Sequence, residues 1–402
     1  MTSGTGSARR TALILASAQA IVGAAAPICI SIGALAGHYL LEQDKSLATA
    51  PVTGFNLGVA LGAIPAAALI RTLGQRGGFM AGTAVTAAGG AVAAAGLFAA
   101  SFLIFAIGLL VIGLGGAFVQ QFRFAAADNA PPQFKARAIS LVLAGGVITA
   151  IVGPQIVIHT RELFAPVMFA GSFVSVIGLA AVGAILLSGL PRRPLVSEGT
   201  VTVADTEPAR PLRTIISQPR FAAALTCAVG TYALMSFVMT GAPLAMVGCG
   251  FSTDDATLGI SWHVMAMFGP SFFTGSLIQR FGAPRIVATG LALLVGCALV
   301  ALSGIELWQF WTALILLGLG WNFGFIGSTA MVAETYRQSE RARVLGFHDT
   351  VLFGSVAFGS FMSGLVYNAY GWDMLNWIVF PVVAISLAAL VLAVTLRRPQ
   401  AA

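Results

Sequence analysis

Long runs of apolar residues separated by short polar segments fill almost the whole chain. Twelve of these runs are long enough to cross about 30 Å of hydrocarbon as helices. They lie at 11–38, 50–70, 79–99, 102–124, 138–158, 166–189, 220–243, 257–278, 286–303, 307–331, 345–369 and 374–396. The pattern predicts an all-α membrane protein with twelve transmembrane helices.

The least apolar segment lies near the middle of the chain. Residues 191–219 combine proline and arginine clusters at both ends with a run rich in serine, threonine and acidic residues, which is the composition of a linker. We therefore expect a six-helix bundle over 1–190, a cytoplasmic linker over 191–219 and a second six-helix bundle over 220–402.

The two halves also resemble each other in sequence. Three short motifs recur at offsets of 205 to 208 residues: Leu69–Gly74 with Leu277–Gly282, Gly113–Phe118 with Gly318–Phe323, and Lys135–Arg137 with Arg341–Arg343. Parallel repeats of this kind place a substrate site between the halves, near the bilayer midplane.

Composition excludes a soluble protein, since 58% of residues are hydrophobic and 9% are charged. The net charge of +7 comes from basic residues spread over the loops, without an aromatic-interleaved patch, so no nucleic-acid partner is expected. We find neither a Ser/His/Asp set nor a nucleotide-binding loop. These observations indicate a non-enzymatic protein of the lipid bilayer without a permanent cofactor.

The basic residues also predict the orientation of the chain. If the N-terminus is cytoplasmic, 19 of the 21 Lys and Arg residues fall on the cytoplasmic side, leaving Lys45 and Arg161 outside. Both termini should then be cytoplasmic. Because Glu42, Asp44 and Lys45 follow the first apolar run in place of a small-residue cleavage site, that run is expected to be a helix and not a signal peptide.

Two local motifs carry a resemblance to the major facilitator superfamily. The segment from Gly275 through Arg280 and Gly282 to Arg285 resembles the signature loop of that family, and Gly145-Gly146 followed by Gly153-Pro154 resembles its Gly-Pro motif. The resemblance implies a loop that takes part in conformational change. Gln279 and Arg71 replace the usual acidic residue, which leaves cytoplasmic anchoring as the alternative role of the basic residues.

Soft metal ligands are concentrated in predicted helices seven and eight. Met235 and Met239 are four residues apart, as are His263 and Met267, so each pair shares a helix face at a spacing of about 6 Å. Thioether and imidazole groups favour Cu(I) over hard cations. An ionisable residue within a membrane span is also a functional candidate by default. The alternatives are a hydrogen-bonded histidine and methionines that only pack.

These pairs resemble the motifs of the CcoA-like copper importers of proteobacteria. The resemblance implies that Met235, Met239, His263 and Met267 bind copper, which would enter the cytoplasm by alternating access and supply cytochrome oxidase maturation. It further implies a bacterial inner-membrane location. Copper chaperones or thiol-disulfide proteins are possible partners, and we expect a monomer.

The remaining candidates are less specific. The resemblance suggests a metal-relay or redox role for Cys227 and Cys249, with inert thiols as the alternative. Asp349, beside His348, is the only acidic residue well inside a predicted span. It could carry a proton in energy coupling or pair with a loop arginine. Polar residues that could line a cavity or only pack between helices are Gln19, Gln120, Gln121 and Asn322.

Two other functions remain open at this point. A sister branch resembles riboflavin transporters, and a flavin site could use Trp262, Tyr232, Trp321 and Asn322. A membrane copper sensor or chaperone that does not transport is the second alternative. The four soft ligands, which a flavin does not need, favour copper, and they lead to the prediction that riboflavin is not the substrate.

Overall fold

The computed structural model describes residues 2–42, 44–131, 134–191 and 210–395. Within these residues all regular secondary structure is helical, as predicted. The helices are α1 (Thr2–Val22), α2 (Ala25–Leu40), α3 (Ala50–Phe98), α4 (Phe102–Gln120), α5 (Phe122–Asp128), α6 (Lys135–Thr160), α7 (Ala170–Ser188), α8 (Leu212–Ile216), α9 (Pro219–Gly248), α10 (Thr253–Phe268), α11 (Ser271–Phe281), α12 (Ala283–Leu302), α13 (Leu307–Ala333), η1 (Gln338–Glu340), α14 (Arg341–Trp377) and α15 (Val379–Thr395).

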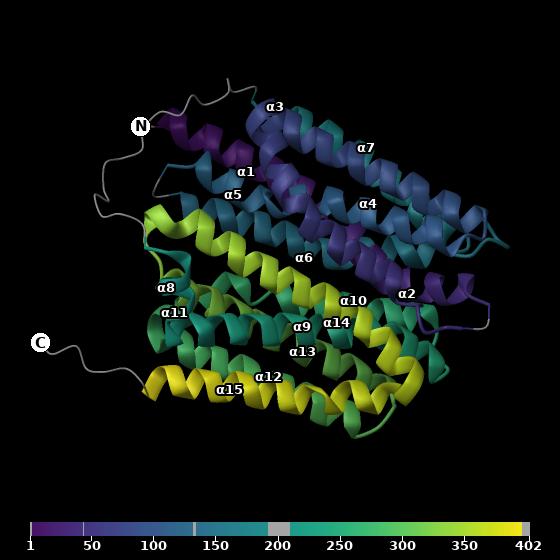
Figure 1. The fold of residues 1–402 in the computed structure, drawn as a ribbon. Coiled ribbons are helices and arrows are strands. Elements are labelled where there is room, and N and C mark those ends of the chain that lie inside the picture. Colours follow the sequence, from purple (N-terminus) through teal and green to yellow (C-terminus); the bar gives the residue numbers. More distant parts are fainter. Residues whose placement is uncertain (1, 43, 132–133, 192–209, 396–402) are drawn as a thin grey trace, which may run out of the picture.

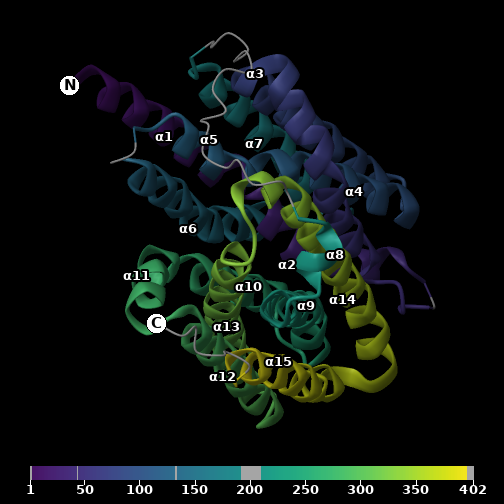
Figure 2. The same ribbon diagram turned by 60° about the vertical axis from the view of Figure 1, so that its left-hand side comes forward.

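The helices run side by side in two groups. Figures 1 and 2 show α1 to α7 on one side of the molecule and α8 to α15 on the other. In Figure 1, α1 begins and α15 ends at the same end of the bundle, which is called the terminal end of the molecule. Within the first group α3 packs on α4 and α1 on α6, and within the second α12 packs on α13 and α9 on α14. Most of the predicted linker lies outside the described residues, so its boundaries stay a prediction.

The described residues contain nine continuous helical stretches that are long and apolar enough to cross a membrane. The difference from the twelve predicted spans has three causes. Helix α3 contains two predicted spans, α10 and α11 form one span broken at Gly269-Pro270, and α15 is 17 residues long, slightly under the length required.

Two glycines make the chain reverse at equivalent places in the two halves. Gly74, inside α3, has φ 73 and ψ 167, and Gly282, between α11 and α12, has φ 84 and ψ 146. A side chain is strained at such positive φ values, which glycine tolerates. The two positions are the ends of the first predicted sequence repeat, so the repeated motif produces the same sharp reversal in each half.

The hydrogen bonds described below that join the two groups lie at the cavity or at the end of the molecule away from the termini. Ser252 and Asp255 form a capping box that starts α10 there and exposes Asp254 to the other group. Hydrogen bonds between the groups join Thr53 to Ser360 (3.3 Å), Asn56 to Ser236 (3.5 Å), Ser261 to Ala150, and Arg161 to Asp254 (2.6 Å). The molecule is therefore held closed at that end.

Candidate functional site

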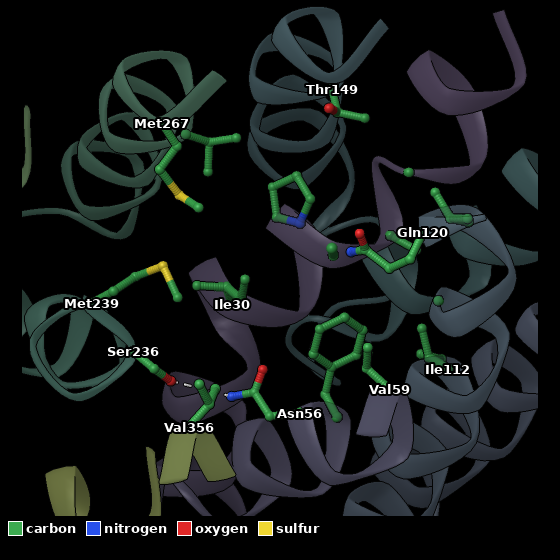
Figure 3. Close-up of a pocket in the computed structure, with 18 of the residues that line it drawn as sticks. Ile30, Asn56, Val59, Ile112, Gln120, Thr149, Ser236, Met239, Met267 and Val356 are labelled. Carbon is green, nitrogen blue, oxygen red and sulfur yellow. Dashed lines mark hydrogen bonds between the residues drawn. The ribbon is translucent and has the colours of Figure 1, made fainter. Parts of the chain in front are cut away.

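A central cavity lies between the two groups of helices (Figure 3). Its walls come from α1, α2, α3, α4 and α6 of the first group and from α9, α10 and α14 of the second. Its empty volume, including the opening to solvent, is about 1060 Å³. A cavity at the interface of repeats, with apolar walls and a few polar groups, is the usual form of a small-molecule site.

Three side-chain amides supply most of the hydrogen-bonding capacity of the first group's wall. Gln19 lies on α1, Asn56 on α3 and Gln120 on α4. Asn56 Nδ2 donates a 3.5 Å hydrogen bond to Ser236 Oγ, whereas the amides of Gln19 and Gln120 have no hydrogen-bond partner among the described residues. Figure 3 shows the Gln120 amide projecting into the cavity. Each amide offers both donors and acceptors to a ligand.

Aromatic rings form part of the remaining wall, with Phe55 from the first group and Tyr232, Phe268 and Phe353 from the second. The Tyr232 ring lies edge-on to Phe353, with centroids 6.0 Å apart. Behind this surface Trp321 packs against Tyr232 at 5.3 Å and against Phe268 at 6.4 Å. The cluster holds the lining rings in place.

The predicted soft ligands separate into two sets. Met235, Met239 and Met267 line the cavity, and Figure 3 shows Met239 and Met267 projecting from one side of it. His263 is not part of the lining: it is 0% exposed, and its Nδ1 lies 2.8 Å from the Leu314 carbonyl oxygen on α13. The structure therefore brings the three thioethers to one cavity and turns the imidazole toward a neighbouring helix. Among the described residues, no group of three His, Cys, Asp or Glu side chains is placed to share a metal ion.

The two candidate cysteines occupy different depths of α9. Cys227 is buried and donates to the Ser386 carbonyl oxygen at 3.3 Å, while Cys249 is exposed at the C-terminal end of the helix. At about 1.5 Å per residue they are about 33 Å apart along the helix axis. Partial burial and the nearby Asp373 raise the pKa of the Cys249 thiol, so it is protonated at neutral pH and is a weak nucleophile.

Asn322 lies outside the cavity lining. It forms hydrogen bonds to both sides of the break between α10 and α11, in the eighth predicted span. Its Nδ2 donates to the Met267 carbonyl oxygen at 2.6 Å and to Ser271 Oγ at 2.8 Å, and its Oδ1 accepts from Thr274 at 2.6 Å. Pro270 cannot donate a backbone hydrogen bond at this break. Asn322 thereby fixes Met267 and the adjoining Phe268 at the cavity wall.

Asp349 lies outside the lining, toward the end of the molecule that carries the termini. Its Oδ1 accepts a 2.9 Å hydrogen bond from His348, and it interacts electrostatically with Arg123 of the first group. The signature-like segment lies at the same end: Arg280 is exposed with its guanidinium 5.3 Å from the Phe281 ring centroid, and Arg285 is exposed at the start of α12. Gly275 is exposed on α11, where an added Cβ would meet open space.

Of the four residues considered for a flavin, Tyr232 reaches the cavity. Trp262 is 44% exposed on the outside of the helices, and Trp321 and Asn322 support the wall from behind. Gln19 and Gln120, considered as cavity residues, do line it. Sequence reasoning missed Asn56, although an amide within an otherwise apolar span is a signal that could have revealed it.

Comparison with known proteins identifies the group to which the fold belongs. Residues 11–321 and 250–402 match the Major Facilitator Superfamily. The chain is 50% identical over 387 residues to a protein named riboflavin transporter RfnT from Brucella anthropi, covering 96% of each chain. It is 29% identical over 369 residues to YdeG of Bacillus subtilis, an uncharacterized transporter of the same type, covering 89% of this chain and 86% of that one.

Among solved structures, a mutant of the nucleoside transporter NupG matches with a TM-score of 0.67 at 13% identity, covering 96% of this chain and all of the other. That likeness supports the fold alone.

The expectation of copper import is wrong, because the relative of 50% identity over nearly the whole chain is named a riboflavin transporter. The prediction that riboflavin is not the substrate loses its basis with it. The error has a physical reason: a methionine thioether is also an adaptable apolar contact, so its spacing on a helix does not identify a metal site. The resemblance to the major facilitator superfamily is confirmed, and the resemblance to its copper-importer branch is not. The chain belongs to the Major Facilitator Superfamily.

Proposed function

We propose that this protein imports riboflavin, or a flavin with the same ring system, across a bacterial inner membrane. The observation that carries the proposal is the 50% identity to a named riboflavin transporter over 96% of both chains. The cavity supports it independently, since it offers a substrate both ring surfaces and hydrogen-bonding groups at the interface of the two repeats.

The chemistry of the lining suits the two parts of riboflavin. Its isoalloxazine ring is flat, with an apolar dimethylbenzene edge and a pyrimidine edge that alternates donors and acceptors. Tyr232 and Phe268 offer aromatic contacts to such a ring, and the amides of Gln19, Asn56 and Gln120 can pair with the pyrimidine edge or with the ribityl hydroxyls.

The methionine cluster acquires a different role in this proposal. Met235, Met239 and Met267 face the cavity and present polarisable sulfur to whatever fills it. Sulfur in contact with an aromatic ring contributes about 0.3–1.5 kcal/mol, and the unbranched side chain adapts to the outline of a ligand. The three thioethers are therefore proposed as contacts of the flavin ring.

We propose that the end of the molecule bearing the termini is cytoplasmic, because the predicted segments on that side hold 19 of the 21 Lys and Arg residues. The closed end, with Arg161 and Asp254, then faces outward, and the structure is an inward-facing state. Transport consists of rocking the bundles of residues 1–190 and 220–402 about the central cavity, without covalent chemistry.

Growth of a riboflavin-auxotrophic bacterium tests this function. Expression of the chain should permit growth at a riboflavin concentration too low for the parent strain, and an empty vector should not. A matched variant, Gln120→Leu, should need more riboflavin than the wild type, because it removes an amide from the cavity. If the wild-type protein is present in the membrane and gives no growth advantage, the proposal fails.

A further inference from the structure

The central cavity is polar in places but carries no formal charge. None of the described residues that line it is an Asp, Glu, Lys, Arg or His. Its hydrogen-bonding groups are neutral amides and hydroxyls, contributed by Gln19, Asn56, Thr86, Gln120, Thr149, Tyr232 and Ser236. A ligand that enters the cavity loses its contacts with water and gains contacts with these neutral polar groups and with the apolar wall.

The charged groups that interact with the lining offset each other. The Arg123 guanidinium interacts electrostatically with Tyr232 at the cavity wall and also with the carboxylate of Asp349. His348 is hydrogen-bonded to the same carboxylate at 2.9 Å. This cluster supplies one positive and one negative side chain, so it offers little net attraction to an anion.

Phosphorylation changes the charge of a flavin, and charge is the property by which an uncharged cavity distinguishes its ligands. Riboflavin is uncharged, whereas a phosphate ester carries about −1.5 to −2 charges at pH 7. Burying an ion without a partner is strongly unfavourable. We infer that the cavity accepts unphosphorylated flavin and rejects riboflavin 5′-phosphate. This inference rests on the proposed function and adds a substrate class to it.

Fluorescence titration of the purified full-length protein tests the inference. Riboflavin and riboflavin 5′-phosphate are titrated separately, and quenching of flavin fluorescence gives each Kd. We expect the phosphate to bind at least 100-fold more weakly, which corresponds to about 2.8 kcal/mol. Equal Kd values would overturn the inference and leave the proposed function intact, and failure of riboflavin itself to bind would overturn both.

A charge placed on the wall provides the matched comparison. Gln120→Arg adds a cation where the wild-type side chain is accessible. It should lower the ratio of the Kd for riboflavin 5′-phosphate to the Kd for riboflavin about tenfold or more. The neutral Gln120→Met should leave this ratio unchanged. Asn56→Lys repeats the test if the first variant does not fold. A wild-type ratio in a cationic variant that still binds riboflavin would overturn the inference. So would tight phosphate binding that Arg123→Gln alone abolishes, because Arg123 would then be a phosphate site.

Discussion

The side-chain amide of Gln120 is the clearest single contact that the cavity offers to a substrate. It projects from α4 into the cavity and has no partner among the described residues (Figure 3). We expect Gln120→Leu to raise the riboflavin concentration that half-saturates uptake about three- to tenfold, because a hydrogen bond contributes about 0.5–1.5 kcal/mol. Gln121→Leu changes the next glutamine, which is not part of the lining, and should have no effect. Equal effects of both variants would contradict a direct contact.

The methionines give a second residue-scale prediction. Met235→Leu and Met239→Leu should each weaken riboflavin uptake by no more than about tenfold, because leucine preserves the apolar volume and only the sulfur contact of about 0.3–1.5 kcal/mol is lost. A Cu(I) chelator should leave uptake unchanged. Uptake assays on membrane vesicles check both expectations. A more than tenfold loss in a variant that is folded and inserted would show that sulfur does more than pack against the ligand.

Residue chemistry explains how far the site could be predicted. The structure places Met235, Met239 and Met267, which their spacing puts on common helix faces, in the lining of one cavity with Gln120, and their role in binding stays a prediction. The identity of the ligand could not follow, because a thioether suits both a soft metal and an aromatic ring. Helical spacing also does not tell whether a side chain faces the cavity or, like His263, the carbonyl oxygen of a neighbouring helix residue, Leu314.

At the scale of elements, the broken helix α10–α11 depends on a side chain from α13. Asn322 satisfies the Met267 carbonyl oxygen beside Pro270, and it is fully buried. We expect Asn322→Leu to lower the free energy of unfolding by about 2 kcal/mol, because it leaves buried polar groups without partners.

Thermal denaturation of the purified protein measures this change. Thr274→Val removes a hydroxyl that lies 2.6 Å from Asn322 Oδ1 and 2.8 Å from the Pro270 carbonyl oxygen, and it leaves the Asn322 bonds to Met267 and Ser271 in place. It should therefore cost less, about 1 kcal/mol. If Asn322→Leu unfolds at the wild-type temperature, the proposed support of the break is wrong.

The reversals and breaks of the helices show which features of the fold can be predicted from the apolar pattern of the sequence. The reversal at Gly282 follows the repeated motif that the sequence displays. The break at Gly269-Pro270 lies inside a predicted span of 257–278, because apolarity continues through it and the missing backbone partner is supplied by a residue about fifty positions later. Hydropathy therefore predicts that a span exists, and tertiary hydrogen bonds decide where it bends.

At the scale of the whole molecule, the ion pair between Arg161 and Asp254 joins the two helix groups at their closed end. Asp254→Asn should increase the fraction of molecules open at that end about two- to fivefold, because a partly exposed ion pair contributes roughly 0–1 kcal/mol. Glu162→Gln is the matched control: Glu162 also pairs with Arg161, at 3.1 Å, but belongs to the same group.

Distances between spin labels at Leu163→Cys and Ser303→Cys, in a Cys249→Ser background, report the opening. A longer-distance population that grows in Asp254→Asn and not in Glu162→Gln is expected. Identical distributions in both variants would show that the ion pair does not help to hold the closed end.

The central claim, import of riboflavin through the cavity between the bundles, is tested most directly by uptake into proteoliposomes. Purified protein is reconstituted, and entry of radiolabelled riboflavin is measured beside entry of radiolabelled copper. We predict saturable riboflavin entry, accelerated exchange when unlabelled riboflavin is preloaded, and copper entry no greater than in protein-free vesicles. Riboflavin entry at the protein-free rate, from protein shown to be folded and inserted, would contradict the account.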